Sequence, residues 1–148
     1  MKKIASISGA IVFAFIIQAF APRLKDVNEK VIQVFKRTFP AAEKVNWEEF
    51  SDRYMVHFEE SHIQVVIDYD KDGNYLRSKR YYGEENLPVN ILHKIKKIYA
   101  DKKIFGVTEL STDMSTDYYI KLEDDKNWTT IKSDANGSFE IYEKFAKQ

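Results

Sequence analysis

Three aspartates at alternate positions, followed by a glycine, have the spacing closest to a metal-binding loop. Asp68, Asp70 and Asp72 precede Gly73, as carboxylates do at the start of an EF-hand calcium loop. That loop also needs a bidentate glutamate at its twelfth position, where this chain has Lys79. Aspartate and glycine here equally predict a hairpin turn with a left-handed glycine. We predict the turn; a calcium-dependent or small hydrolytic envelope protein using the Asp68/Asp70/Asp72 cluster is the alternative.

The other residues that could do chemistry form no recognised catalytic pattern. The chain has three histidines, His57, His62 and His93, and no cysteine. The histidine spacing matches no zinc motif, and thiol catalysis needs a cysteine. The sequence contains neither a nucleophile elbow nor a glycine-rich phosphate loop. We therefore predict that the protein is not an enzyme and that it uses no cofactor and no metal.

Aromatic residues, by contrast, are frequent in stretches that alternate like β-strands. Phe, Trp and Tyr make up 14% of the chain, and tyrosines stand side by side at Tyr81-Tyr82 and Tyr118-Tyr119. Neighbouring residues of a strand point to opposite faces of the sheet, and Tyr and Trp dominate binding hot spots. Aromatic pairs can instead serve to stabilise the sheet. If helices cover one face only, the candidate binding residues of the other are Trp47, Tyr81, Tyr119 and Trp128.

Two helices and eight strands follow from the hydrophobic spacing. Residues 26–38 form the first predicted helix, with Asp26 as its N-cap and Glu29 at capping-box distance. Pro88 lies in or near the first turn of the second, whose apolar face includes Ile91 and Ile95. The predicted strands cover residues 44–50, 53–60, 62–70, 75–82, 104–110, 118–122, 127–134 and 138–145.

The second half of the chain repeats the pattern of the first at an offset of 64 residues. Val27 and Val31 correspond to Ile91 and Ile95, and the Asp70–Gly73 turn corresponds to residues 134–137. The sequence therefore predicts an α+β fold of two tandem α-β-β-β-β repeats, residues 22–83 and 84–148. We expect a continuous or side-by-side antiparallel sheet with both helices on one face.

The start of the chain has the pattern of a secretory signal peptide. Lys2 and Lys3 precede a stretch that is apolar almost throughout to Ala21. We predict a signal peptide over residues 1–21, with Pro22 disfavouring cleavage at that point and an uncleaved membrane anchor as the alternative. The protein would then be exported to the periplasm or cell envelope, or secreted. The full chain has 23 basic and 23 acidic residues, which gives no basic field for nucleic acid.

The repeat resembles the PepSY-like family of β-lactamase-inhibitor-like (BLIP-like) proteins, which are exported proteins of Bacteroidetes. The residues that carry the resemblance are Phe35, Phe39-Pro40-Ala41, Val45-Asn46-Trp47, residues 54–58, residues 68–73, Leu87-Pro88 and Ile91. The resemblance implies a fold like that of β-lactamase inhibitor protein and an envelope location. It implies no activity, and the disulfides of that inhibitor have no counterpart here. We expect a non-enzymatic binding module whose partner is an envelope protein or peptide, without contact to the membrane once the signal peptide is removed.

Overall fold

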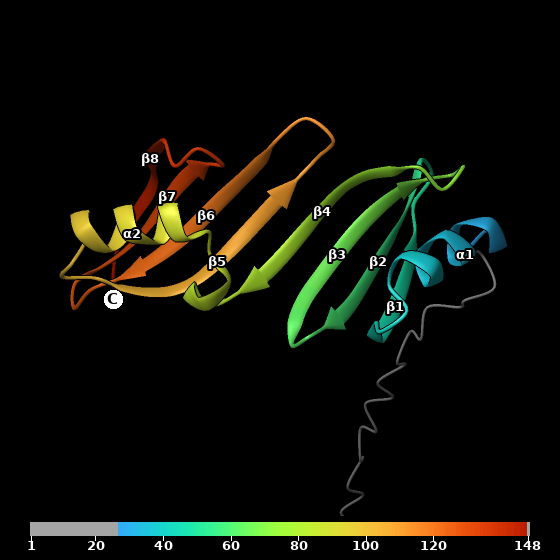
Figure 1. The fold of residues 1–148 in the computed structure, drawn as a ribbon, viewed down its shortest axis with the longest axis horizontal. Coiled ribbons are helices and arrows are strands. Elements are labelled where there is room, and N and C mark those ends of the chain that lie inside the picture. Colours follow the sequence, from blue (N-terminus) through green and yellow to red (C-terminus); the bar gives the residue numbers. More distant parts are fainter. Residues whose placement is uncertain (1–26, 148) are drawn as a thin grey trace, which may run out of the picture.

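Two helices and one antiparallel sheet of eight strands make up the computed structural model, which describes residues 27–147 (Figure 1). The predicted α+β class is confirmed, and the sheet is continuous. Its strands are hydrogen-bonded in chain order. The predicted signal peptide lies outside the described residues. The elements are α1 (Glu29–Thr38), β1 (Glu43–Glu49), β2 (Arg53–Glu60), β3 (Ile63–Asp70), β4 (Tyr75–Tyr82), a 3-10 turn (Glu84–Asn86), α2 (Val89–Ile98), β5 (Lys103–Ser111), β6 (Thr116–Glu123), β7 (Asn127–Asp134) and β8 (Phe139–Ala146).

Helix α1 begins later than the sequence pattern predicts. Asn28 is its N-cap, and the side-chain oxygen of Asn28 accepts a hydrogen bond of 2.9 Å from the backbone N–H of Lys30. The prediction that Asp26 caps this helix is therefore wrong, because Asn28 supplies the acceptor two residues further on. Both helices bury one narrow apolar stripe, formed by Val31, Ile32 and Phe35 of α1 and by Ile91 and Ile95 of α2.

The inward-facing residues of strands β2 to β7 share one face of the sheet. Val56 lies opposite Ile67, which in turn lies opposite Ser78. Ser78 and Tyr82 are four residues apart on β4 and therefore point to the same side. Tyr82 lies opposite Val107, from which the buried row continues across β6 and β7. The register of the strands therefore keeps these side chains on one face of the sheet from β2 to β7.

Both helices pack on this face, which we call the helix side. The ring of Phe35 in α1 lies 5.4 Å from that of Trp47 and 5.1 Å from that of Phe58, measured between ring centroids. On α2, the Lys94 Nζ donates to the backbone oxygen of Gly137 at 3.0 Å. The helices lie near opposite ends of the sheet (Figure 1). The prediction that both helices cover one face is confirmed.

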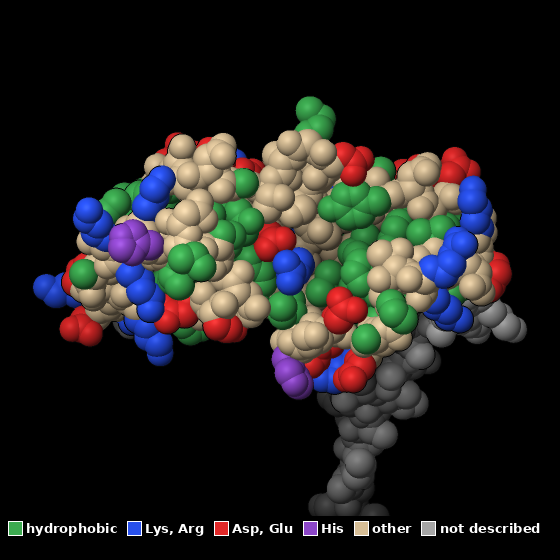
Figure 2. All heavy atoms as spheres, in the orientation of Figure 1, with side chains coloured by type: hydrophobic (Ala, Val, Ile, Leu, Met, Phe, Trp, Pro, Cys, Tyr) green, Lys and Arg blue, Asp and Glu red, His purple; other side chains and the backbone are tan. Residues whose placement is uncertain are grey.

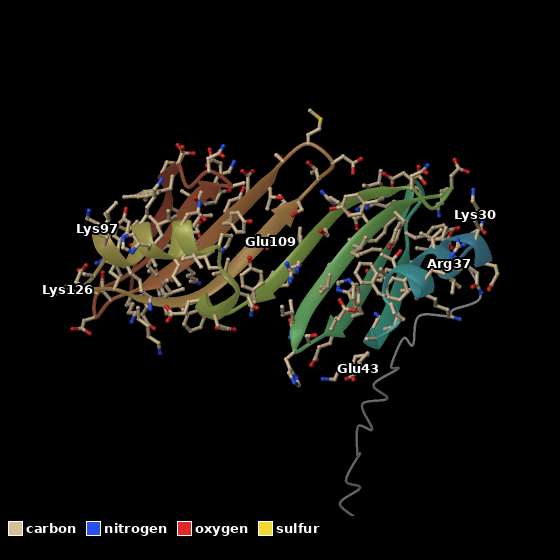
Figure 3. All side chains as sticks on the ribbon, viewed as in Figure 1. Lys30, Arg37, Glu43, Lys97, Glu109 and Lys126 are labelled. Atoms are coloured by element: carbon tan, nitrogen blue, oxygen red, sulfur yellow. The ribbon has the colours of Figure 1, made fainter. Side chains whose placement is uncertain are left out.

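Polar side chains occupy the helix side of β4 and β5, between the two helices. The Tyr82 hydroxyl donates to Glu109 at 2.5 Å, and the Tyr75 hydroxyl donates to the Ser111 carbonyl at 2.9 Å. Glu109 lies in the middle of the sheet, away from both helices (Figure 3). Burial of its hydroxyl raises the pKa of Tyr82 well above its usual range, and the hydrogen bond to the Glu109 carboxylate raises it further. The hydroxyl therefore stays protonated and remains a donor. The centre of the sheet is thus held by hydrogen bonds instead of helix packing.

The turn after β3 has the predicted hairpin chemistry. The Asp70 carboxylate accepts hydrogen bonds from the Asn74 side chain and from the backbone N–H groups of Asn74 and Asp72, all within 2.9 Å. These hydrogen bonds lower the pKa of Asp70, and the bond from the Asn74 side chain has the largest effect. Gly73 has a φ of 89°, so the predicted left-handed glycine is confirmed. The β2–β3 turn differs, because Ser61 and His62 both take positive φ without a glycine.

An aspartate at the centre of either helix stripe should unfold the protein. Val31 and Ile95 are 0% and 1% exposed, so Val31→Asp or Ile95→Asp would bury a carboxylate without a partner. We expect a loss of several kcal/mol in the free energy of unfolding, measured by urea denaturation. Val89→Asp is the control, since Val89 is 80% exposed on α2. Equal losses for the buried and exposed positions would contradict the packing described.

Candidate functional site

The face opposite the helices carries a shallow hollow lined mainly by aromatic rings. We call this face the open face, because none of the helices among residues 27–147 covers it. The hollow has a volume of about 430 Å³ and extends from β4 to β8. We call it the aromatic cup. Its open-face lining consists of Tyr81, Phe105, Gly106, Thr108, Tyr119, Lys121, Thr130, Tyr142 and Glu143.

A β-bulge in β5 places one wall of the cup. Ile104 lies opposite Leu122 and Gly106 lies opposite Lys121, so Phe105 is an extra residue without a partner. A bulge redirects the side chain of its extra residue. The ring of Phe105 therefore stands on the open face, 5.0 Å from the ring of Trp128 between centroids. Phe105 is 62% exposed and contributes little to the core.

A second bulge, in β8, places the opposite wall. Thr130 lies opposite Glu143 and Ile131 lies opposite Ile141, which leaves Tyr142 as the extra residue. The Tyr142 ring packs edge-on against Tyr119, with 5.2 Å between the ring centroids. The Thr130 hydroxyl donates to the Glu143 carboxylate at 3.0 Å. The bulge thus brings two consecutive side chains, one aromatic and one acidic, to the same face.

Gly106 forms the floor between these walls. A Cβ atom added at Gly106 would have only the backbone oxygen of Tyr82, at 3.9 Å, within contact distance. The space above the floor is therefore empty because this residue has no side chain. Glycine inside a strand often marks a bulge or a close approach of another group, and here it deepens the cup.

The cup carries one cation without a carboxylate partner and one carboxylate that already accepts a hydrogen bond. Lys121 Nζ lies 4.8 Å from the centroid of Trp128 and 6.0 Å from that of Phe105. Within residues 27–147, Lys121 forms no salt bridge, whereas Lys147 pairs with Glu123 at 2.6 Å. Cation–π contacts of this kind contribute about 0.5–1 kcal/mol at exposed sites. Such a hollow can receive an apolar or aromatic group and offer polar contacts at its rim.

Three of the four sequence-predicted binding residues belong to this region. Tyr81 and Tyr119 line the cup, and Trp128 adjoins it through Phe105. Trp47 does not lie there. It is 5% exposed and packs on the helix side against Phe35. The prediction that Trp47 belongs to the open face is wrong, because α1 covers β1 and the Trp47 ring is buried against the Phe35 ring of that helix.

Phe105 and Tyr142 are the aromatic cup residues that the sequence pattern missed. Simple alternation assigns every second residue to the same face, and a bulge breaks this rule for one residue. Gly106, directly after Phe105, is the one signal in the sequence that marks such a position. No comparable signal accompanies Tyr142.

The aspartates of the alternative hypothesis serve other purposes. Asp68 is buried on the open face, where its carboxylate accepts a hydrogen bond of 2.6 Å from Arg77 and lies 3.6 Å from Arg53. Asp70 is used by the turn, and Asp72 is exposed. Within residues 27–147, acidic and histidine side chains form no cluster of three that could hold a metal ion. The geometry therefore gives no support to a calcium-dependent function.

The histidines also lie apart from one another. His57 is 3.2 Å from Glu48, and His62 is 3.7 Å from Glu59 at a turn of β2 and β3. His93 is exposed on α2. None of them lines the aromatic cup.

Similarity to solved structures supports the fold. A BLIP-like protein from Bacteroides fragilis has a TM-score of 0.62 at 17% identity, covering 80% of this chain and 85% of that chain. A DUF2874 family protein from Bacteroides uniformis gives 0.61 at 14% identity, with 80% and 88% covered. A protein from Bacteroides eggerthii described as "putative periplasmic" gives 0.62 at 13% identity, with 81% and 88% covered. These structures match the BLIP-like resemblance at the level of the fold. No protein-family model matches the chain, and no curated protein does.

Filling the floor of the cup should leave the fold intact. Gly106→Leu adds a side chain to empty space at a position without a positive φ. We expect the free energy of unfolding to stay within about 1 kcal/mol of the parent or to rise, since glycine weakens strand interiors. Gly73→Leu is the matched control, and its φ of 89° should cost about 1–3 kcal/mol. Urea midpoints measure both, and a Gly106→Leu loss as large as that of Gly73→Leu would refute the empty floor.

Proposed function

We propose that the protein is an exported, non-enzymatic binding module whose binding surface is the aromatic cup of the open face. The observation that carries the proposal is the pair of bulges that lift Phe105 and Tyr142 out of the sheet. Both rings are more than half exposed. Exposed rings add little to folding stability, because burial is what makes aromatic side chains stabilising. Large exposed aromatic residues around a hollow are typical of binding sites.

The partner that fits this surface is a protein or peptide of the cell envelope. The cup has room for an apolar or aromatic side chain, and Lys121 and Glu143 can bond polar groups at its rim. Support for an envelope location comes from the apolar N-terminal stretch, the absence of cysteine and the description of the Bacteroides eggerthii protein. No helix among the described residues is long and apolar enough to cross a membrane.

Site-specific photocrosslinking tests this surface. We expect p-benzoylphenylalanine at position 119 or 142, in the envelope of the producing bacterium, to form an adduct with a discrete partner. The same group at Val89, which is exposed on the helix side, should not. Gly106→Leu in the position-119 variant should abolish the adduct, because it fills the cup without unfolding the protein.

Adducts of equal strength from position 89, or adducts that persist with Gly106→Leu, would refute the proposal. Once the partner is known, Tyr119→Ala should weaken binding by at least tenfold, since hot-spot tyrosines contribute about 2 kcal/mol or more. Titration calorimetry with the purified partner measures this change.

A further inference from the structure

Strand β8 is an edge of the sheet with an exposed side. It pairs with β7, and no strand among residues 27–147 pairs with its other side. Seven of its eight residues are exposed. An edge strand presents a row of unpaired backbone N–H and C=O groups, along which a further strand can pair. The sheet can therefore be extended at β8.

Large apolar side chains stand on both faces of this edge. Ile141 lies opposite Ile131 and therefore points to the helix side. Phe145 lies opposite Trp128 and therefore points to the open face. Ile141 and Phe145 are each 58% exposed. A helix docked on one face would cover only one of them, whereas a strand paired along β8 contacts side chains of both faces. The edge therefore fits a strand.

The bulge at Tyr142 leaves most of this edge regular. Bulges are one of the means by which proteins protect edge strands. In β8, however, residues 143–146 pair one by one with β7 after the bulge, and residues 139–141 do so before it. Both segments therefore keep the backbone geometry that a neighbouring strand needs.

The opposite edge of the sheet, strand β1, is better protected. Its pairing with β2 shifts register between Glu43 and Asn46, and Lys44 within this shift has a φ of 53°. Of the seven residues of β1, Val45 is the one large hydrophobic residue that is exposed. Irregular pairing and charged side chains are how edge strands avoid association. The two edges therefore differ, and β8 is the one suited to a partner.

The charges of β8 indicate which strand that partner supplies. Glu140 and Glu143 lie in the first half of the strand, whereas Lys144 and Lys147 lie in the second half or directly after it. Glu140 and Lys144 are exposed and take part in none of the salt bridges within residues 27–147, while Lys147 pairs with Glu123. Two antiparallel copies of β8 place the acidic half of each along the basic half of the other. Neighbouring strands are about 4.8 Å apart, so these charges attract across the pair.

Pairing of β8 with β1 of another copy is disfavoured by charge. In an antiparallel arrangement, the acidic half of β8 would lie along the second half of β1, which contains Glu48 and Glu49. Like charges opposite each other destabilise a sheet. A head-to-tail contact would also leave a free edge at each end of the assembly. Two β8 strands, by contrast, form a closed pair.

We propose that the protein forms a homodimer in which the β8 strands of two copies pair antiparallel and join their sheets. The two-fold axis is perpendicular to the sheet, so both copies turn their open faces to the same side. The dimer therefore presents two aromatic cups on one surface. A single pair of strands is a small interface, so the association is weak and depends on concentration. This inference does not depend on the function proposed for the cup.

Sedimentation velocity over a concentration series tests the dimer. We expect the parent protein to change from monomer to dimer as its concentration rises to the millimolar range. Glu140→Lys and Lys144→Glu should each weaken dimerisation about tenfold or more, because each places like charges along the paired strands. An equimolar mixture of the two variants should restore dimerisation, since their charges are again complementary. Neither position lines the cup.

Lys97→Glu is the matched control, because it makes the same charge change at an exposed lysine away from β8. Lys and His side chains gather over α2, where Lys97 lies (Figure 2, Figure 3). Dimerisation should not change in this variant. Ile141→Ser, at an exposed position outside the cup, gives a second test and should weaken dimerisation without a charge change. Thermal unfolding checks that each variant folds.

A parent protein that stays monomeric at millimolar concentration would overturn the proposal. A mixture of Glu140→Lys and Lys144→Glu that dimerises no better than either variant alone would do the same. Species larger than a dimer would show growth through β1 and would also contradict the closed pair.

Discussion

Two ten-residue helices cannot cover an eight-stranded sheet, and this mismatch determines the rest of the structure. A helix is about 10 Å wide with its side chains, whereas eight strands spaced by about 4.8 Å span roughly 34 Å. Each helix therefore covers its own end of the sheet, and β4 and β5 remain between them (Figure 1). The chain fills this gap with the Tyr82–Glu109 and Tyr75–Ser111 hydrogen bonds. A hollow of about 460 Å³ between α1 and β4 lies at the border between helix packing and this polar centre.

The side chains of the open face are under fewer packing constraints, because no helix among the described residues packs against them. There the strands can depart from regular pairing without opening the core. Both bulges that build the aromatic cup lie in the second half of the sheet, at Phe105 and Tyr142. Gly106 then leaves room between them. The bulge in β5 lies between two paired strands, β4 and β6, whereas the bulge in β8 lies in an edge strand, where only the pairing with β7 is affected.

Sequence reasoning reached the fold and part of the candidate site. The helical spacing of Val31 and Phe35 and the strand alternation from Tyr54 to Phe58 require helices on one face, and the structure has them there. Adjacent tyrosines such as Tyr118-Tyr119 must point to opposite faces of the sheet, and this alternation predicts Tyr119 as a binding residue of the open face. Trp47 was misplaced because a lone aromatic on an edge strand does not reveal its side. Phe105 and Tyr142 were missed because their faces depend on bulges, which alternation cannot predict.

The aromatic cup and the hollow between α1 and β4 share strand β4 yet remain separate. Arg80 points to the helix side and lines the hollow beside α1, while Tyr81, the next residue, points to the open face and lines the cup. Strand alternation puts the thickness of the sheet between them. A substitution in one hollow therefore leaves the lining of the other unchanged. The exposed rings of the cup are therefore independent of the packing that α1 requires on the helix side, and they need their own explanation.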